Sequence, residues 1–292
     1  MLTHRYPYLP AVFWVLASTA LWTLIFAAAK FAALFSASPA GALQITWLRF
    51  GGALLAALAL VPLSGGAALL HSTRPLTHLL RALCGGGAAL SITWASAHMP
   101  LVDATALGMT YGVLVTLLGA LVLAERPGPM RLWAGGLGLL GAAAILLGRG
   151  AFQQALPPGP ALAATGAAVL LAAEGLLIRI LGQREKALTV IIHVCFFGFC
   201  LMAVPAWLTW QPITWRSVAI CIALGPVALV AQYCTIRGYR AAPLSVVGPV
   251  DYTWLIFAAL LGYVAFGERP APATVAGGLM ILAAGTLLAR SR

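Results

Sequence analysis

Acidic side chains and asparagine are the residues that this sequence has least of. Only six of its 292 residues are Asp or Glu, asparagine is absent, and charged residues of both signs make up 8% of the chain. Without asparagine there is no N-glycosylation sequon, and no Walker, HExxH or GxSxG motif occurs. The sequence therefore gives no support for direct use of ATP, for zinc-protease chemistry or for a serine hydrolase.

Cysteine is also sparse, and its spacing excludes the usual metal and redox patterns. The five cysteines never form a CxxC pair, and all of them fall in apolar stretches. We interpret them as small packing residues and expect no disulfide, no metal and no cofactor. They are Cys84, Cys195, Cys200, Cys221 and Cys234.

Long hydrophobic runs are what the sequence has in abundance. Hydrophobic residues make up 62% of the chain, and its mean hydropathy is +0.99, well outside the balance of soluble domains. Runs of roughly 18 or more apolar residues, each long enough to cross a hydrocarbon core of about 30 Å, recur from Val12 to Ala289. They do not alternate apolar with polar positions, so helices are favoured over a barrel. The predicted fold class is an all-α integral membrane protein.

Proline, glycine and charged residues divide these runs into ten predicted transmembrane helices. The first run is longer than the core of a signal peptide and has no cleavage site, so we expect it to remain in the mature protein. The predicted spans are 11–34, 41–62, 76–98, 101–123, 130–148, 159–181, 187–209, 217–238, 243–266 and 273–289.

Basic residues are distributed unevenly between the two sides that these spans define. With a cytoplasmic N-terminus, twelve Lys or Arg residues fall on the cytoplasmic side, Arg81 among them, and three fall on the other side. This positive-inside pattern predicts that both termini are cytoplasmic. It also explains the net charge of +11 as a topology signal, so we expect contact with the lipid bilayer and no nucleic-acid partner.

A Glu-Arg-Pro-x-Pro motif occurs twice, beginning at Glu125 and at Glu268. Aligning the two glutamates also superposes Tyr111 on Trp254 and Gly119 on Gly262. The chain is therefore interpreted as a duplicated unit of five spans, with an odd number of spans forcing the second copy to be inverted. The motif itself is interpreted as a structural corner, in which a solvated helix end makes local ion pairs before proline breaks the helix. The two predicted repeats are residues 1–150 and 151–292.

These features together resemble the EamA branch of the drug/metabolite transporter superfamily. The resemblance rests on the duplicated five-helix unit, on the prolines at 100 and 243, on the Glu-Arg helix ends, and on the Ala-Gly-Gly sequences at 134–136 and 276–278. It implies a bacterial cytoplasmic-membrane transporter that works by alternating access around a central cavity lined by spans one, three, four, six, eight and nine. Within the family, the aromatic residues resemble those of aromatic amino acid exporters.

Ionisable side chains at membrane depth are the first candidates for the site, because burying them costs several kcal/mol unless they face water or a partner. Glu174 and Asp251 are predicted to contact a substrate ammonium group or to exchange a proton. For each, the alternative is a pair with Ser, Thr or Arg on a neighbouring helix. Lys30 and Arg49 can snorkel or pair, and Asp103 is expected to cap a helix N-terminus.

Aromatic residues form a more specific pattern. Five of them lie too deep for an interface belt and are expected to stack a planar or apolar substrate, with packing against neighbouring helices as the alternative. Ser91, Trp94 and His98 share one helix face that could line a polar cavity, although a buried structural histidine is the alternative for His98, and also for His193. The candidate substrate-binding residues are Trp22, Ser91, Trp94, His98, Tyr111, Glu174, Tyr233, Asp251, Tyr252 and Trp254.

The sequence thus predicts a secondary transporter that exports a small metabolite, foremost an aromatic or other apolar amino acid. No catalytic residues are predicted, and a monomer suffices because both repeats are fused. Exporters of other amino acids or of cationic drugs are alternatives. A carrier of phosphorylated metabolites is disfavoured because only Lys30 and Arg49 are candidates for binding a phosphate. Outside the class of carriers, the alternatives are an integral membrane enzyme, a channel and a scaffold.

Overall fold

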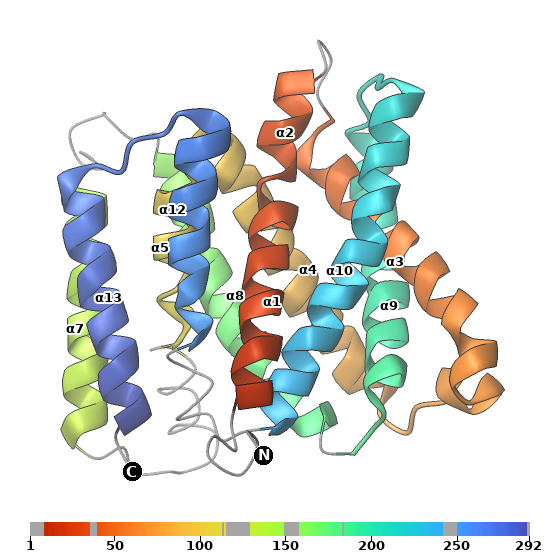
Figure 1. Cartoon of the computed structure of the whole chain (residues 1–292). Coiled ribbons are helices and arrows are strands. Elements are labelled where there is room, and N and C mark those ends of the chain that lie inside the picture. The colour runs from red at the N-terminus through yellow and green to blue at the C-terminus, as the bar shows by residue number, and fades with distance from the viewer. Residues whose placement is uncertain are drawn as a thin grey trace.

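A computed structural model describes residues 9–35, 40–112, 114, 129–148, 158–182, 184–241 and 250–290, and all regular structure in these ranges is helical. The helices are shown in Figure 1. Their bounds are α1 (Leu9–Phe26), α2 (Ala28–Phe35), α3 (Ala42–Ser64), the 3-10 helix η2 (Gly66–Leu70), α4 (Pro75–His98), α5 (Leu101–Gly108), α7 (Pro129–Gly148), α8 (Pro158–Gly182), α9 (Ala187–Leu208), α10 (Trp215–Ala241), α12 (Thr253–Phe266) and α13 (Pro272–Arg290).

Several of these helices are long and apolar enough to cross a membrane. Among the described residues, α1, α3, α8, α9 and α10 meet both criteria, and shorter apolar helices lie within α7, α12 and α13. Large apolar side chains are exposed on the outside of the bundle, for example Phe13, Leu55 and Trp207. Such a surface suits lipid and not water. These observations confirm the prediction of an all-helical, multi-pass membrane protein.

Prolines and glycines in the sequence mark many of the helix ends. Helices α4, α7, α8 and α13 each begin at a proline, whose missing N–H costs nothing in the first turn. Helices α3 and α12 end at Gly65 and Gly267, which have φ of 137° and 64°, values that residues with a Cβ rarely adopt. Most predicted spans therefore agree with the observed helices to within a few residues.

The first predicted span differs, because the helix is interrupted at Ala27 between α1 and α2. The Thr19 and Thr23 hydroxyls donate hydrogen bonds to the carbonyl oxygens of Leu16 and Thr19. Side-chain bonds of this kind compete with the helix backbone and bend it. The Glu125 motif and parts of the fourth and ninth predicted spans lie outside the described residues.

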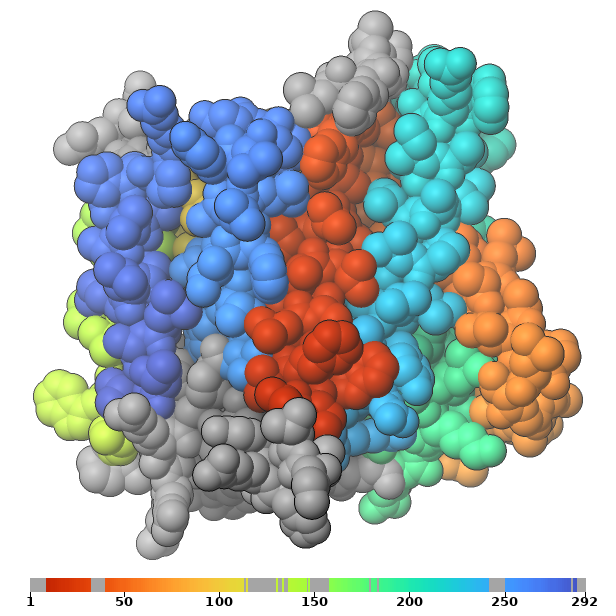
Figure 2. Space-filling model, in the orientation of Figure 1, coloured from red at the N-terminus to blue at the C-terminus, as the bar shows by residue number. Residues whose placement is uncertain are grey.

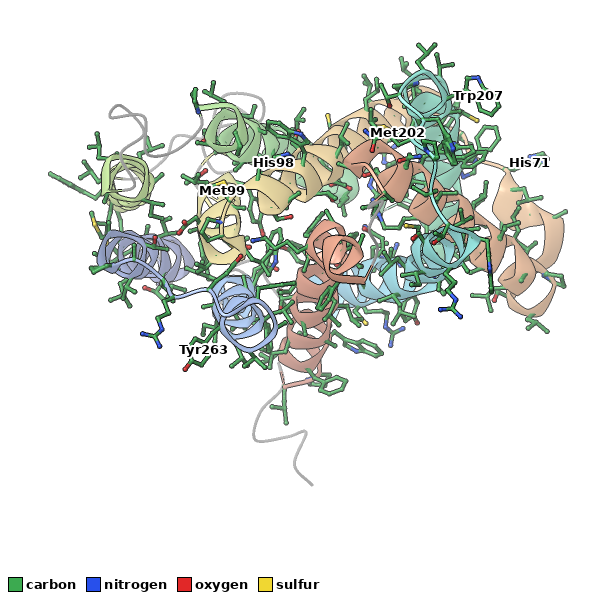
Figure 3. All side chains as sticks on the ribbon, turned by 90° about the horizontal axis from the view of Figure 1, so that it is seen from above. His71, His98, Met99, Met202, Trp207 and Tyr263 are labelled. Carbon is green, nitrogen blue, oxygen red and sulfur yellow. The ribbon has the colours of Figure 1, made fainter. Side chains whose placement is uncertain are left out.

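The helices stand roughly side by side, with α1 beginning and α13 ending at the same end, the lower end in Figure 1. Helices α7 and α13 form one edge, α3, α9 and α10 form the opposite edge, and α1, α4 and α8 lie between them, as the view from above in Figure 3 also shows. Figure 2 shows α13, α12, α1 and α10 side by side on one face.

Close helix contacts depend on glycine. A Cβ on Gly277 would lie 2.4 Å from the carbonyl oxygen of Gly141, and one on Gly225 would lie 2.2 Å from the backbone nitrogen of Ala53. The backbones of α7 and α13, and those of α3 and α10, are therefore nearly in contact. Small residues at such crossings are how helices associate in lipid, where burial of apolar surface gives little driving force.

Candidate functional site

The centre of the bundle holds a buried ion pair between α4 and α8. Arg81 Nη2 donates to Glu174 Oε1 over 3.4 Å, and Arg81 Nη1 donates to the carbonyl oxygen of Val190 over 3.3 Å. Arg81 is completely buried, and the Glu174 side chain is 14% exposed. The Arg partner that sequence reasoning allowed for Glu174 is therefore present, but it is Arg81, which had been counted only as a topology signal on the cytoplasmic side and is in fact buried.

Glycine makes room for this ion pair. A Cβ on Gly85 of α4 would lie 2.7 Å from Cδ and Oε1 of Glu174. The Glu174 carboxylate thus lies directly against the α4 backbone, in a space that any larger residue would fill. Gly85 is the first of three consecutive glycines at 85–87, and it is the one that makes this space.

A second guanidinium lies beside the ion pair. Arg49 of α3 is 5% exposed, and its Cζ lies 4.6 Å from the ring centroid of Phe50 and 6.0 Å from that of Trp22. Both distances fall in the range of cation–π contacts. Arg49 therefore reaches from α3 to the central helix α1.

Aromatic rings continue from Trp22 across α1 to α12. The rings of Trp22 and Phe26 stack at 5.4 Å with an angle of 18°, and those of Phe26 and Trp254 stack at 5.2 Å with an angle of 30°. The Trp22 indole donates to Thr235 Oγ1 over 3.3 Å. The buried indole N–H of Trp254 has no hydrogen-bond partner within the described ranges. Trp22, Phe26 and Trp254 are called the aromatic stack below.

A second acidic group lies next to the apolar cluster that contains Phe26 and Trp254. The carboxylate oxygen Oδ2 of Asp251 accepts hydrogen bonds from the hydroxyls of Tyr111 and Tyr239, the latter over 2.6 Å. Tyr252 and Trp254 are buried in one hydrophobic cluster, with Tyr111 packed against it. The structure thus brings five of the predicted residues together, on α1, on α12 and in the segments that follow α5 and precede α12. They are Trp22, Tyr111, Asp251, Tyr252 and Trp254. The sixth, Glu174 of α8, is paired with Arg81 instead.

Sequence reasoning missed Arg81, Phe26 and Tyr239. Tyr239 lies between two arginines near the end of α10, where the pattern resembles an interfacial helix end. Phe26 is the last residue of α1, and its side chain carries no polar atom. Its position one turn after Trp22 on the same face is the signal that could have identified it.

The other predicted site residues lie elsewhere. Tyr233 is 38% exposed and packs edge-on against Trp14, with Arg237 over both rings, on an outer surface of α1 and α10. Trp94 is 37% exposed, and its ring lies 4.8 Å from that of His98.

The residues near the C-terminal end of α4 are more exposed than a buried histidine there would require. His98 is exposed, so the alternative of a buried structural histidine was wrong for it. Ser91 is half-buried on the same helix. Figure 3 labels His98 beside α8. His193 is partly buried and hydrogen-bonded to the Thr189 carbonyl, as its structural interpretation required.

At the upper end, Glu268 joins three helices. Its carboxylate pairs with Lys30 of α2 and accepts a hydrogen bond of 2.8 Å from the backbone N–H of Leu101, the first residue of α5. The prediction of a local ion pair at a solvated helix end was wrong, because the partners come from distant helices. Asp103 lies in the first turn of α5, where its charge suits the positive end of the helix as predicted, and its Oδ1 also accepts a 2.6 Å hydrogen bond from Thr274 of α13.

At the lower end, Glu185 accepts hydrogen bonds from Ser72 Oγ over 2.6 Å and from His78 Nε2 over 2.8 Å. The His78 ring stacks on that of His193 at 4.6 Å. Burial raises the pKa of Glu185, but the two hydrogen bonds favour its charged form more strongly, so the pKa lies below its ordinary value. This network ties the η2–α4 connection to the α8–α9 turn.

Within the described ranges, no group of three or more His, Cys, Asp or Glu side chains is arranged to hold a metal ion. The five cysteines are free.

Comparison with known proteins fits this geometry. The model of the EamA-like transporter family matches residues 159–290. A riboflavin transporter from Rhizobium johnstonii is 30% identical over 240 residues, which cover 77% of this chain and 74% of that protein. The chain belongs to the EamA-like transporter family. Another relative, the pseudopaline exporter CntI of Pseudomonas aeruginosa, is 28% identical to this EamA-like chain over 231 residues, which cover 78% and 79% of the two proteins.

A solved crystal structure shares the fold of this EamA-like chain. The two match with a TM-score of 0.65 over 95% of this chain and 96% of the other, at 20% sequence identity. The relatives and the family model together make the chain a membrane transporter of the EamA type.

Proposed function

We propose that this EamA-like protein is a secondary transporter that exports small organic metabolites with an aromatic or apolar portion, foremost aromatic amino acids. The observation that carries the proposal is the aromatic stack. Tyr111, which packs against the same cluster, donates to the half-buried Asp251, and Arg49, which lies over Trp22, faces the half-buried Glu174. Stacked rings bind planar or apolar groups, and the unpartnered Trp254 indole N–H offers a donor for a polar end.

The packing of the helices supports an inverted repeat in which the first five predicted spans correspond to the last five. Helix α4 packs along α8 as α1 packs along α10, α3 packs on α10 as α9 packs on α4, and α5 packs on α8 as α12 packs on α1. Corresponding helices also pair directly, α3 with α9, α5 with α12 and α7 with α13. This is the pattern expected of two repeats, residues 1–150 and 151–292, related by a twofold axis in the membrane plane.

The named relatives support a small organic substrate without selecting one, because one is a pseudopaline exporter and another is a riboflavin transporter. The aromatic amino acid proposal draws instead on the stack and on the resemblance of the sequence to the aromatic amino acid exporter YddG. An export direction is likewise a proposal, in a bacterial cytoplasmic membrane with the lower end of Figure 1 in the cytoplasm.

Alternating access would open the aromatic stack to one side of the membrane at a time. Opening toward the upper end requires that the bonds from Glu268 to α2 and α5 break, since these bonds hold three helices together there. With both repeats in one chain, a monomer contains a complete site.

Counterflow in proteoliposomes tests the function. Vesicles loaded with unlabelled Phe or Trp should accumulate labelled Phe, with saturation, and Thr inside should give less exchange. Trp254→Ala should reduce exchange roughly tenfold or more, since a stacked ring contributes about 1 kcal/mol beyond its buried area. Trp207→Ala is the matched control, because Trp207 is 78% exposed on the outer surface.

Equal exchange by Trp254→Ala and by the control would refute the aromatic site. Flux of Phe that does not saturate and shows no counterflow would indicate a channel. Silence with amino acids, together with exchange of a cationic drug, would replace the substrate class.

A further inference from the structure

Arg49 is a buried cation without an anion of its own. Glu174, the acidic group that faces it, bonds to Arg81. Arg49 makes no hydrogen bond or ion pair with any side chain or backbone group in the described ranges, and its guanidinium touches the Phe50 and Trp22 rings. Two guanidinium groups and one carboxylate therefore lie together in the centre of the bundle, so that among the described residues the cations outnumber the anions by one.

Such a charge needs a partner. Arginine stays protonated in proteins, and an uncompensated charge in a membrane interior costs several kcal/mol. Two cation–π contacts recover only about 1–2 kcal/mol each. The hydroxyl of Thr46, one turn before Arg49 on α3, is also buried without a partner among the described residues. A ligand oxygen at this position would satisfy both groups.

The neighbouring ring indicates what kind of anion fits. Trp22 contacts Arg49 on one side and begins the aromatic stack on the other. A molecule with an acidic group at Arg49 would therefore place its apolar portion on Trp22. Guanidinium groups bind carboxylates through two parallel hydrogen bonds, which supply both energy and orientation.

We infer that Arg49 binds the carboxylate of the transported substrate, so that the substrate class is aromatic or apolar organic acids, amino acids included. The inference rests on the proposed function, because it places the acid at the same aromatic stack. It assigns Arg49 the role of selecting acids over uncharged analogues of the same shape.

Ligand-dependent thermal unfolding of the purified full chain in detergent tests the assignment without requiring transport. The probes are 3-phenylpropionate, its uncharged amide, the corresponding amine 3-phenylpropylamine, and inorganic phosphate. The wild type should bind the acid roughly 10- to 100-fold more tightly than the amide, as charge-assisted hydrogen bonds would provide. Arg49→Gln should remove this preference, and Arg49→Lys should keep part of it.

Arg237→Gln is the matched control. Arg237 also lies over a tryptophan ring, 5.6 Å from that of Trp14, but on the outer surface. This variant should keep the full preference for the acid. If Arg49→Gln fails to fold, the wild-type comparison of acid, amide and amine still decides, supported by Arg49→Lys.

Three results would overturn the inference. They are equal binding of acid and amide by the wild type, an unchanged acid preference in Arg49→Gln or Arg49→Lys, and protection by inorganic phosphate as strong as that by the acid. Acid preference without Phe counterflow would leave the Arg49 site standing and refute only the proposed amino acid substrate. Phe counterflow without acid preference would refute only the Arg49 site.

Discussion

Gly85→Ala should weaken the Arg81–Glu174 pair without replacing either charged residue. The added Cβ would lie 2.7 Å from Cδ and Oε1 of Glu174 and 2.9 Å from Oε2. Ordinary contact begins at about 3.4 Å, so the carboxylate must move by about 0.7 Å. Because the present Nη2–Oε1 distance is already 3.4 Å, this movement separates the pair to about the limit of an ion pair.

The cost comes from the charge and not from the clash. A carboxylate at the end of a flexible side chain can turn away cheaply, but breaking a buried ion pair costs about 3–5 kcal/mol. A partial separation should therefore cost about 1–3 kcal/mol, from which alanine recovers about 0.5–1 kcal/mol through its higher helix propensity. Gly87→Ala is the matched control, since its Cβ would meet only the tip of Leu170 at 3.1 Å.

Thermal unfolding in detergent and counterflow in proteoliposomes measure the two consequences. Gly85→Ala should lower the unfolding midpoint and the exchange rate, and Gly87→Ala should leave both close to the wild type. Glu174→Asp alone, whose shorter side chain draws the carboxylate away from Arg81 without any clash, should lower both quantities in the same way as Gly85→Ala. Identical behaviour of the two glycine variants would show that the position of the Glu174 carboxylate does not matter.

Three further predictions concern the two ends and one edge of the bundle. Glu268→Gln should lower the unfolding midpoint by the equivalent of about 1–3 kcal/mol, because Lys30 loses its anion while mostly buried. Adding Lys30→Met to Glu268→Gln should restore part of this stability. If the losses of the two single variants simply add in the double variant, the two residues do not form a direct pair. Gly277→Ala should lower the free energy of unfolding by about 1–3 kcal/mol, since its Cβ would lie 2.4 Å from an α7 carbonyl oxygen. Gly136→Ala is the control: its Cβ would have nothing within 4 Å, so it should leave the unfolding midpoint unchanged. Because the pKa of Glu185 is lowered in the folded state, its carboxylate should stabilise the fold fully above about pH 5, and this stabilisation should be lost as the pH falls through the lowered pKa. If Glu185→Gln loses free energy of unfolding with falling pH as steeply as the wild type does, that account is refuted.

The helices were predictable because the membrane imposes simple rules on the sequence. Apolar length, proline at helix starts and glycine at helix ends placed α3, α4 and α7 to within a few residues of their observed bounds. The break at Ala27 was not predictable from hydropathy. Apolar length carries no information about where within an apolar run a helix is interrupted.

The site was predictable in part, for a physical reason. Deep aromatic and acidic residues are rare enough in apolar spans to be recognised individually, which identified Trp22, Trp254, Glu174 and Asp251. Arg81 was missed because the positive-inside rule assigns a basic residue to a side from its place in the sequence. Its burial depends on which helix packs against it, and that is decided by tertiary contacts between α4 and α8.

The polar contacts also bear on which parts of the molecule can move. Most long-range side-chain bonds among the described residues join residues before 150 to residues after it, including Arg81–Glu174, Tyr111–Asp251, Lys30–Glu268 and His78–Glu185. The helix pairs in closest contact do the same, as α7 with α13 and α4 with α8. The two halves of the chain, moving as separate bodies, would have to break all of these contacts in each cycle. A transport cycle that keeps most of them intact must instead move bodies that each contain helices from both halves, such as α5, α7, α12 and α13 against α3, α9 and α10. The aromatic stack and the Arg81–Glu174 pair, carried by α1, α4, α8 and α12, lie between those two groups of helices.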